Sequence, residues 1–321
     1  MNLSRRRMLA ISASLPVLAG PARSPAADGP VDAAKSKLII LGTGGGPNVG
    51  GPRYMTSHVI VCGDDAYVVD CGYGVTEQLV RAHVPLANIR DVFITHHHPD
   101  HDIETGTLIY FAWYNGLKTP LDLYGGPPLK QIVADYMAAQ KPDVDIWVQD
   151  IDHTPMPPIR VHEISQGGPV MADANVKVSA ALVDHGAVKP AFAYRFDMAD
   201  RSIVFSGDTS PVQAVVDLAK GADILVHEAI DLDTVRARPR PTPKPGAPAP
   251  TVDFDKLMQH LASSHTSTEE VGRIAQEAGV KTLVLSHLSP GADTIPDAVW
   301  SEKAARHFTG KIIVAHDLMV L

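Results

Sequence analysis

The segment Thr95-His96-His97-His98-Pro99-Asp100-His101-Asp102 decides how this sequence of 321 residues is interpreted. Alternate side chains of an extended segment share a face, so His96 and His98 can hold one cation. A turn follows, and Asp100 and His101 then project toward a second position. Imidazole suits zinc, and a mixed set of His and carboxylate groups leaves room for a coordinated water. An accidental exposed run of histidines is the alternative, but this run follows a predicted buried strand.

Composition narrows the kinds of site that the chain can build. It contains 15 His but only 2 Cys, too few cysteines for a disulfide scaffold or a four-cysteine zinc site. Cys62 and Cys71 flank a predicted hairpin, and we expect buried thiols rather than a bridge. The net charge of −8 argues against a protein held to nucleic acid by its overall charge.

The N-terminus has the pattern of a targeting signal. Arg5-Arg6-Arg7 precede an uncharged apolar stretch from Met8 to about Ala19, which is too short to span a bilayer, since a spanning helix needs roughly 20 residues. The pattern resembles the bacterial twin-arginine signal, with cleavage expected near residues 24–26. We therefore predict a signal peptide over 1–27, export by the twin-arginine machinery, and a soluble periplasmic protein formed by one domain over 28–321. An uncleaved membrane anchor is the alternative.

The rest of the chain has strands first and then strands that alternate with helices, which favours two sheets packed between helices. A loop rich in glycine follows the first strand and is expected beside a site. Residues 236–250 are too rich in proline for a helix or a central strand and should form an exposed loop. The expected strands are 35–41, 57–62, 66–70, 91–95, 121–124, 176–182, 192–196, 202–205, 224–227, 282–286 and 312–315, and the expected helices 75–81, 129–139, 211–219, 268–278 and 297–308.

The H-x-H-x-D-H motif resembles that of the metallo-β-lactamase superfamily, and the resemblance extends over nearly the whole mature chain. Further motifs match in order: Asp70 as a structural aspartate, His185, Asp208 and His287, each at a predicted strand end. The resemblance implies an αββα four-layer sandwich with two mixed β-sheets flanked by helices. It also implies two metal ions that share the carboxylate of Asp208. One ion would have His96, His98 and His185, and the other Asp100, His101 and His287.

Within the superfamily the closest resemblance is to the tRNase Z-like branch. It rests on Leu41-Gly42-Thr43-Gly44, Pro190–Arg195, His227-Glu228-Ala229 and Ser264-His265-Thr266-Ser267. Bacterial tRNase Z carries an arm that grips tRNA between the segments that end at Arg195 and begin at Gly207, and residues 196–206 leave room only for a hairpin here. The missing arm, the export signal and the acidic charge together make tRNA an unexpected substrate. The sequence looks more like the exported zinc arylsulfatases and class II cyclic-nucleotide phosphodiesterases of this branch.

The hypothesis from the sequence is therefore an arylsulfatase-like hydrolase that cleaves a sulfate or phosphate ester with a hydroxide held by two Zn²⁺, with Mn²⁺ or Fe²⁺ as other possible metals. Its partner would be a small anionic ester, with no nucleic acid and no stable membrane anchor. Asp100, His265 and Glu228 are the candidate catalytic residues, with His265 as the acid and Glu228 orienting it; both could instead only support the ligands. A periplasmic cyclic-nucleotide phosphodiesterase and a non-catalytic metal- or partner-binding protein are the alternatives.

Two further features bear on specificity. Phe111, Trp113 and Tyr114 could wall an aryl pocket, although their helical spacing is more typical of a core. The proline-rich loop 236–250 could form a lid whose arginines attract an anion, or an inert surface loop.

Overall fold

The computed structural model describes residues 35–237, 253–291 and 295–321. The predicted signal and most of the proline-rich loop lie outside these residues, so export and the lid remain untested predictions. No helix within the described ranges is long and apolar enough to cross a membrane.

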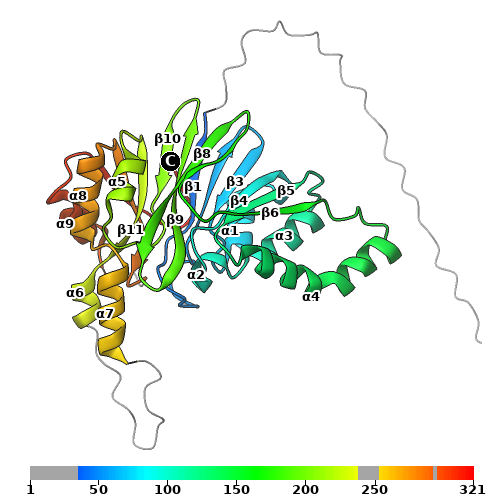
Figure 1. Cartoon of the computed structure of the whole chain (residues 1–321), viewed down its shortest axis with the longest axis horizontal. Helices are drawn as coiled ribbons and strands as arrows, with labels where there is room; N and C mark the ends of the chain where they lie inside the picture. Colours follow the sequence, from blue (N-terminus) through cyan, green and yellow to red (C-terminus); the bar gives the residue numbers. More distant parts are fainter. Residues whose placement is uncertain (1–34, 238–252, 292–294) are drawn as a thin grey trace, which may run out of the picture. The chain divides into compact units, whose positions relative to one another are not determined.

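The described chain forms two mixed β-sheets of seven strands each (Figure 1). The order of the first sheet is β14-β1-β2-β3-β4-β5-β6, and that of the second is β13-β12-β11-β10-β9-β8-β7. The first contains β1 Lys37–Gly42, β2 Ser57–Cys62, β3 Asp65–Val69, β4 Ile89–Phe93, β5 Leu121–Gly125, β6 Ile159–Glu163 and β14 Met319–Val320. The second contains β7 Gly168–Ala172, β8 Val176–His185, β9 Val188–Met198, β10 Ser202–Phe205, β11 Ile224–Ile230, β12 Thr282–Ser289 and β13 Lys311–Val314.

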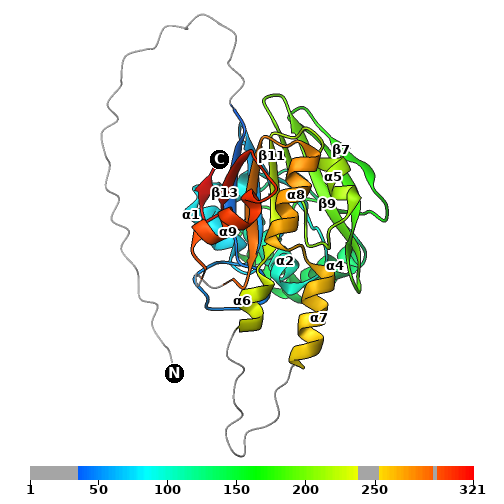
Figure 2. The ribbon, with the colours of Figure 1, turned by 90° about the vertical axis from the view of Figure 1, so that its left-hand side faces the viewer.

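Helices cover the outer face of each sheet (Figures 1 and 2). The first sheet is covered by α1 Val75–Arg81, the 3-10 turn η1 Leu86–Asn88, α3 Thr105–Tyr114 and α4 Leu129–Asp150, and the second by α5 Gln213–Ala219, α8 Thr268–Ala278 and α9 Asp297–Ala305. The short α2 Pro99–Asp102 lies at the same end of the molecule as α6 Leu232–Ala237 and α7 Phe254–Ser264 in both views. The predicted four-layer αββα sandwich is confirmed.

Strand β1 is apolar at successive positions because it is buried on both faces. Leu38 and Ile40 belong to the core between the two sheets, whereas Ile39 and Leu41 pack in the core under the helices. Because side chains alternate across a strand, a strand buried on both faces is apolar throughout.

Several predicted elements have the predicted bounds, and others were missed. The strands 57–62 and 202–205 and the helices 75–81 and 268–278 are correct. Ser267 is the N-cap residue of α8, and its side chain accepts a hydrogen bond from the Glu270 N–H. The prediction for α4 is wrong at its end, because the helix continues through Pro142 to Asp150. Strands β6, β7 and β14 and helices α2, α3, α6 and α7 were not predicted.

The two cysteines are both free thiols, as expected. Cys71 is buried, whereas Cys62 is only partly buried, which corrects the prediction for that residue.

Candidate metal centre and catalytic pair

The predicted site residues lie together where strands of both sheets end. His96 and His98 follow β4, Asp100 and His101 lie in α2, and His185 is the last residue of β8. From the second sheet, Asp208 follows β10, Glu228 lies in β11 and His287 in β12. Polar side chains separated by up to 191 positions of sequence, from His96 to His287, therefore meet at one edge of the sandwich.

The first group consists of His96, His98, His185 and Asp208, whose ligand atoms lie within 4.8 Å of one another. The Nδ1 atom of His98 lies 3.2 Å from Nε2 of both His96 and His185. Asp208 Oδ2 lies 3.9 Å from His96 Nε2 and 3.8 Å from His185 Nε2. Three ring nitrogens and a carboxylate that converge in this way match the donor set that binds a divalent cation.

The second group consists of Asp100, His101 and His287, again with ligand atoms within 4.8 Å. His287 Nε2 lies 3.2 Å from Asp100 Oδ2 and 3.2 Å from Asp208 Oδ2. Asp208 Oδ1 lies 3.3 Å from His101 Nε2, and these two buried atoms have no hydrogen-bond partner among the described residues. Buried polar atoms are normally paired, so the two orphaned atoms fit a cation held between them. Asp208 lies between both groups, as the resemblance implies.

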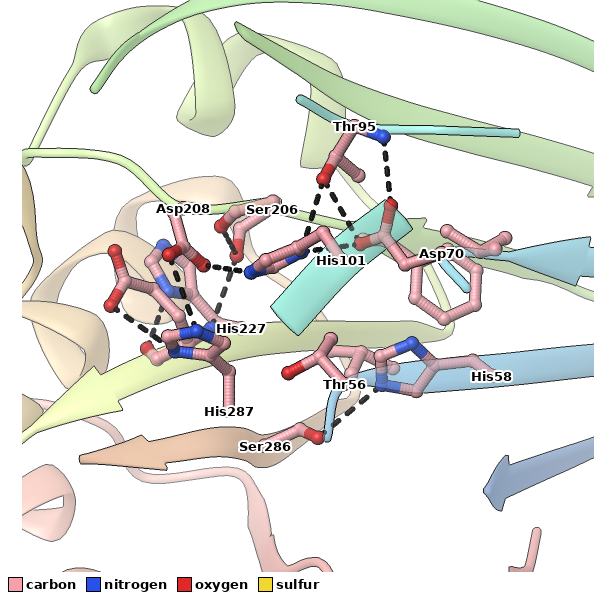
Figure 3. A pocket seen from close by; sticks show the side chains of 15 residues that line it. Thr56, His58, Asp70, Thr95, His101, Ser206, Asp208, His227, Ser286 and His287 are labelled. Atoms are coloured by element: carbon pink, nitrogen blue, oxygen red, sulfur yellow. Dashed lines mark hydrogen bonds and ion pairs between the residues drawn. The ribbon is translucent and has the colours of Figure 1, made fainter. Parts of the chain in front are cut away.

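The support beneath the second group comes from Asp70. Its carboxylate accepts hydrogen bonds from the Thr95 N–H at 2.8 Å, from the Thr95 hydroxyl at 2.9 Å and from His101 Nδ1 at 2.8 Å. The bond from Nδ1 leaves His101 Nε2 free to face Asp208, and Figure 3 shows His101 between the two carboxylates. Asp70 has a φ of 63°, a left-handed conformation that costs energy in a non-glycine residue.

Glu228 and His265 form the predicted pair beside these groups. Glu228 Oε2 lies 2.8 Å from His265 Nδ1, and Glu228 Oε1 accepts the Thr209 N–H at 2.7 Å. Both side chains are buried. Glu228 and His265 also form a cluster with Asp208 and His287 that could hold an ion. Both oxygens of Glu228 already have hydrogen-bond partners within the protein, Thr209 and His265.

Charges within the cluster shift the pKa values of its members in opposite directions. Burial lowers the pKa of His185 to about 4, so this ring is neutral and can donate a lone pair. Burial opposes the charge of Asp208, but the neighbouring His287 and His101 hold its pKa well below the usual range. Burial also opposes the charge of His265, yet the carboxylates of Glu228 and Asp208 raise its pKa to about 9.

Sequence reasoning missed two contacts that fix the ligands. The Gly46 N–H donates to Asp100 Oδ2 at 2.8 Å, which places the glycine-rich loop beside the site as expected. His185 Nδ1 donates to the Ser264 carbonyl at 2.8 Å, so the end of α7 orients that ligand. No sequence signal identified the second contact, because 79 positions separate the two residues.

Three further histidines lie near the cluster without joining it. His97 contacts the Asp102 carboxylate and the Gly126 carbonyl, both at 2.8 Å, so both its ring nitrogens are used in holding the loop. His58 and His227 are buried and line a cavity of about 20 Å³ beneath the ligands (Figure 3).

A larger cavity of about 250 Å³ opens over the candidate ligands. Its lining includes Asp100, Asp208, His265 and His287, together with side chains of α7. The three aromatic residues considered for an aryl pocket do not line it. They cluster instead with Tyr110, Trp147 and His153, and among them only Trp113 is fully buried.

Comparisons with known proteins agree with this geometry. The profile described as "Beta-lactamase superfamily domain" matches residues 66–288. The chain is 32% identical over 289 residues to "Ribonuclease Z" of Mycobacterium bovis (strain BCG / Pasteur 1173P2), covering 88% of this chain and 96% of that protein. It is also 32% identical over 285 residues to "Ribonuclease Z" of Mycobacterium sp. (strain KMS), covering 88% and 94%.

Solved structures have the same fold. The short form of human tRNase Z matches with a TM-score of 0.64 and 20% identity over 89% of this chain and 98% of that one. The metallo-beta-lactamase fold protein YhfI from Bacillus subtilis matches with the same TM-score and identity over 89% and 99%.

These relatives correct the functional prediction from sequence. The relatives named ribonuclease Z, which have nearly the same length, contradict the prediction of an exported arylsulfatase or cyclic-nucleotide phosphodiesterase. They also contradict the prediction that the partner is a small anionic ester and not a nucleic acid. The coarser prediction of a hydrolase with a dinuclear metal site agrees with the family and with the donor clusters. The chain belongs to the beta-lactamase superfamily, in the branch of the ribonuclease Z proteins.

Proposed function

We propose that this protein is a metal-dependent hydrolase that cleaves phosphodiester bonds in RNA. The observation that carries the proposal is the pair of donor groups that share Asp208, in a chain that matches ribonuclease Z proteins over 88% of its length. The cavity over these groups, with the buried pair of Glu228 and His265 at its side, gives a phosphate ester room to approach them.

We infer that two zinc ions occupy the donor groups, because imidazole nitrogens and carboxylate oxygens form the set that zinc prefers. One ion would be held by His96, His98 and His185, and the other by Asp100, His101 and His287, with Asp208 between them. When bound, a pair of divalent cations lowers the pKa of water and neutralises charge on a phosphate.

The chain's own residues position the groups that react. Asp70 and Thr95 fix the ring of His101, and the Gly46 N–H fixes the carboxylate of Asp100. A positioned general acid or base typically contributes 10²- to 10⁴-fold to a rate. His265 is placed to supply a proton to the leaving oxygen, because its ring lines the cavity and Glu228 favours its protonated form.

The test is cleavage of a tRNA precursor with a 3′ extension by the zinc-loaded protein. His265→Ala is expected to lower kcat at least a hundredfold while two metals stay bound, as counted by elemental analysis. His316→Ala is the matched control, since His316 is half-exposed and pairs with Asp297 through its ring. If both variants cleave the precursor as fast as the wild type, His265 is not the acid. A zinc-loaded wild type that leaves every RNA intact would remove the proposed function.

A further inference from the structure

Helix α7 forms one wall of the active-site cavity, and sequence reasoning assigned it no role. Asp253 is its N-cap residue, and the side chain of Asp253 accepts hydrogen bonds from the N–H groups of Asp255 and Lys256. The carbonyl of its last residue, Ser264, accepts a hydrogen bond from His185 Nδ1, and His265 follows directly after the helix. The position of α7 is therefore tied to a candidate metal ligand and to the candidate acid.

Three side chains of α7 line this cavity: Leu257, His260 and Leu261. Positions separated by three or four residues share one face of a helix, so the three form a single stripe. His98, Pro99 and Asp100 of the metal motif line the same cavity. The stripe thus brings one polar group and two apolar ones into the cavity that also contains candidate metal ligands.

His260 has few contacts that would occupy its ring. Its Nδ1 atom lies 3.3 Å from the Ser264 hydroxyl, which can donate to it. Its ring centroid lies 6.2 Å from that of His185 and 6.3 Å from that of His265, too far for a direct hydrogen bond between rings of this orientation. Within residues 35–237, 253–291 and 295–321, it has no carboxylate partner. When Nδ1 accepts from the Ser264 hydroxyl, the ring hydrogen is on Nε2, and this N–H can donate to a bound molecule.

We propose that His260 binds an oxygen of the ribose–phosphate backbone of the substrate, while Leu257 and Leu261 pack against the adjoining sugar or base. This inference rests on the proposed function. A ring N–H placed at the cavity wall adds a directional contact, so it positions the strand within the cavity.

The test compares His260→Leu with His260→Gln, which keeps a side-chain N–H. Gln259→Leu is the matched control, because Gln259 is exposed on the same helix and does not line the cavity. The loss of one net hydrogen bond of about 1.4 kcal/mol corresponds to a tenfold change. His260→Leu is therefore expected to weaken calorimetric binding of adenosine 5′-monophosphate to the zinc-loaded protein about tenfold, and to raise KM for RNA by a similar factor with little change in kcat. The Gln variant should recover most of both effects, with unchanged metal content and Tm in all variants.

Two different failures can be separated by these measurements. Equal affinity for adenosine 5′-monophosphate in the wild type and in His260→Leu would overturn the role of His260, whatever the activity. Binding of the nucleotide that depends on His260, without cleavage of any RNA, would support the role of His260 and overturn the proposed function. A zinc-loaded wild type that neither binds the nucleotide nor cleaves RNA would overturn both.

Discussion

The contact between Glu228 and His265 gives the sharpest test of proton transfer. The carboxylate is held on one side by the Thr209 N–H at 2.7 Å and on the other by His265 Nδ1 at 2.8 Å. The substitution Glu228→Gln keeps the size and the oxygen that accepts from Thr209. It removes the negative charge and replaces the oxygen that accepts from His265 Nδ1 with an amide NH2, which cannot accept that hydrogen, and both changes disfavour the protonated imidazole.

The magnitude follows from the geometry of the pair. An opposite charge within about 4–6 Å shifts a pKa by roughly 1–3 units, so Glu228→Gln should lower the pKa of His265 by that amount. Burial already favours the neutral ring, and Glu228 with Asp208 raises the pKa to about 9, above the usual value of 6.5. An acid works below its pKa, so activity falls as the pH rises through that value. The loss should therefore begin at lower pH in the variant. Bound cations beside Asp208 lower the pKa of His265 in the wild type and in the variant alike. The test therefore compares the pKa of His265 between the two proteins rather than with a fixed value.

The assay is the pH dependence of kcat for RNA cleavage, measured with equal metal content in both proteins. The descending limb should move down by about 1–3 units in Glu228→Gln. Hydrolysis of bis-p-nitrophenyl phosphate serves as an internal control, because p-nitrophenolate leaves without a proton and its limb should move less. Descending limbs at the same pH in the two proteins would refute the proton-transfer role of His265.

Three other perturbations follow from the structure. A side chain at Gly45 would place its Cβ 2.9 Å from the ring of His287 and displace this candidate ligand. Gly45→Ala should therefore weaken metal binding by about 10- to 100-fold in calorimetry. Gly51→Ala is the control and should leave metal binding unchanged, because a Cβ at Gly51 has no atom within 4 Å. Burial and the neighbouring Asp122 raise the pKa of Asp91 to about 7, so the folded state holds this proton more tightly than the unfolded state. The free energy of unfolding should then fall between about pH 4 and 7, and urea denaturation of Asp91→Asn should lack that fall; an equal fall in both proteins would contradict it. Removal of metal with a chelator should lower Tm, and zinc at a thousand times its Kd should restore about 4 kcal/mol; an unchanged Tm would show that the clusters hold no metal.

The candidate site could be predicted from sequence better than the elements that surround it. Extended backbone places His96 and His98 on one face, and the structure brings their ring nitrogens within 3.2 Å of each other. The later members, such as His185 and His287, could be placed only through the resemblance, because nothing in their local sequence specifies which distant strand ends meet. Spacing along the chain thus predicts which neighbouring residues, such as His96 and His98, can share a site. Which distant residues join them depends on the topology of the fold.

The missed elements lack the patterns on which sequence prediction depends. Strands β6 and β7 each lie at an edge of a sheet, and most of their side chains are partly exposed, so no clean apolar alternation marks them. Helix α4 buries only Leu129 and Val133, and Pro142 within it normally indicates an end. Contacts made elsewhere in the fold, rather than local preference, stabilise these segments.

The exclusion of nucleic acid went wrong for a physical reason that the site makes clear. Residues 196–206 do form only a hairpin, with Ser202 paired to Asp197, so the expected absence of an inserted arm is correct. An absent insertion, however, says nothing about the surfaces that remain, such as α7 and the cavity it lines. The net charge of −8 was also the wrong quantity, because two divalent cations at the Asp208 cluster would themselves bring four positive charges to the point where a phosphate must bind. Local charge at the site, with its metals counted, therefore decides whether a phosphodiester can approach, and the average over the chain does not.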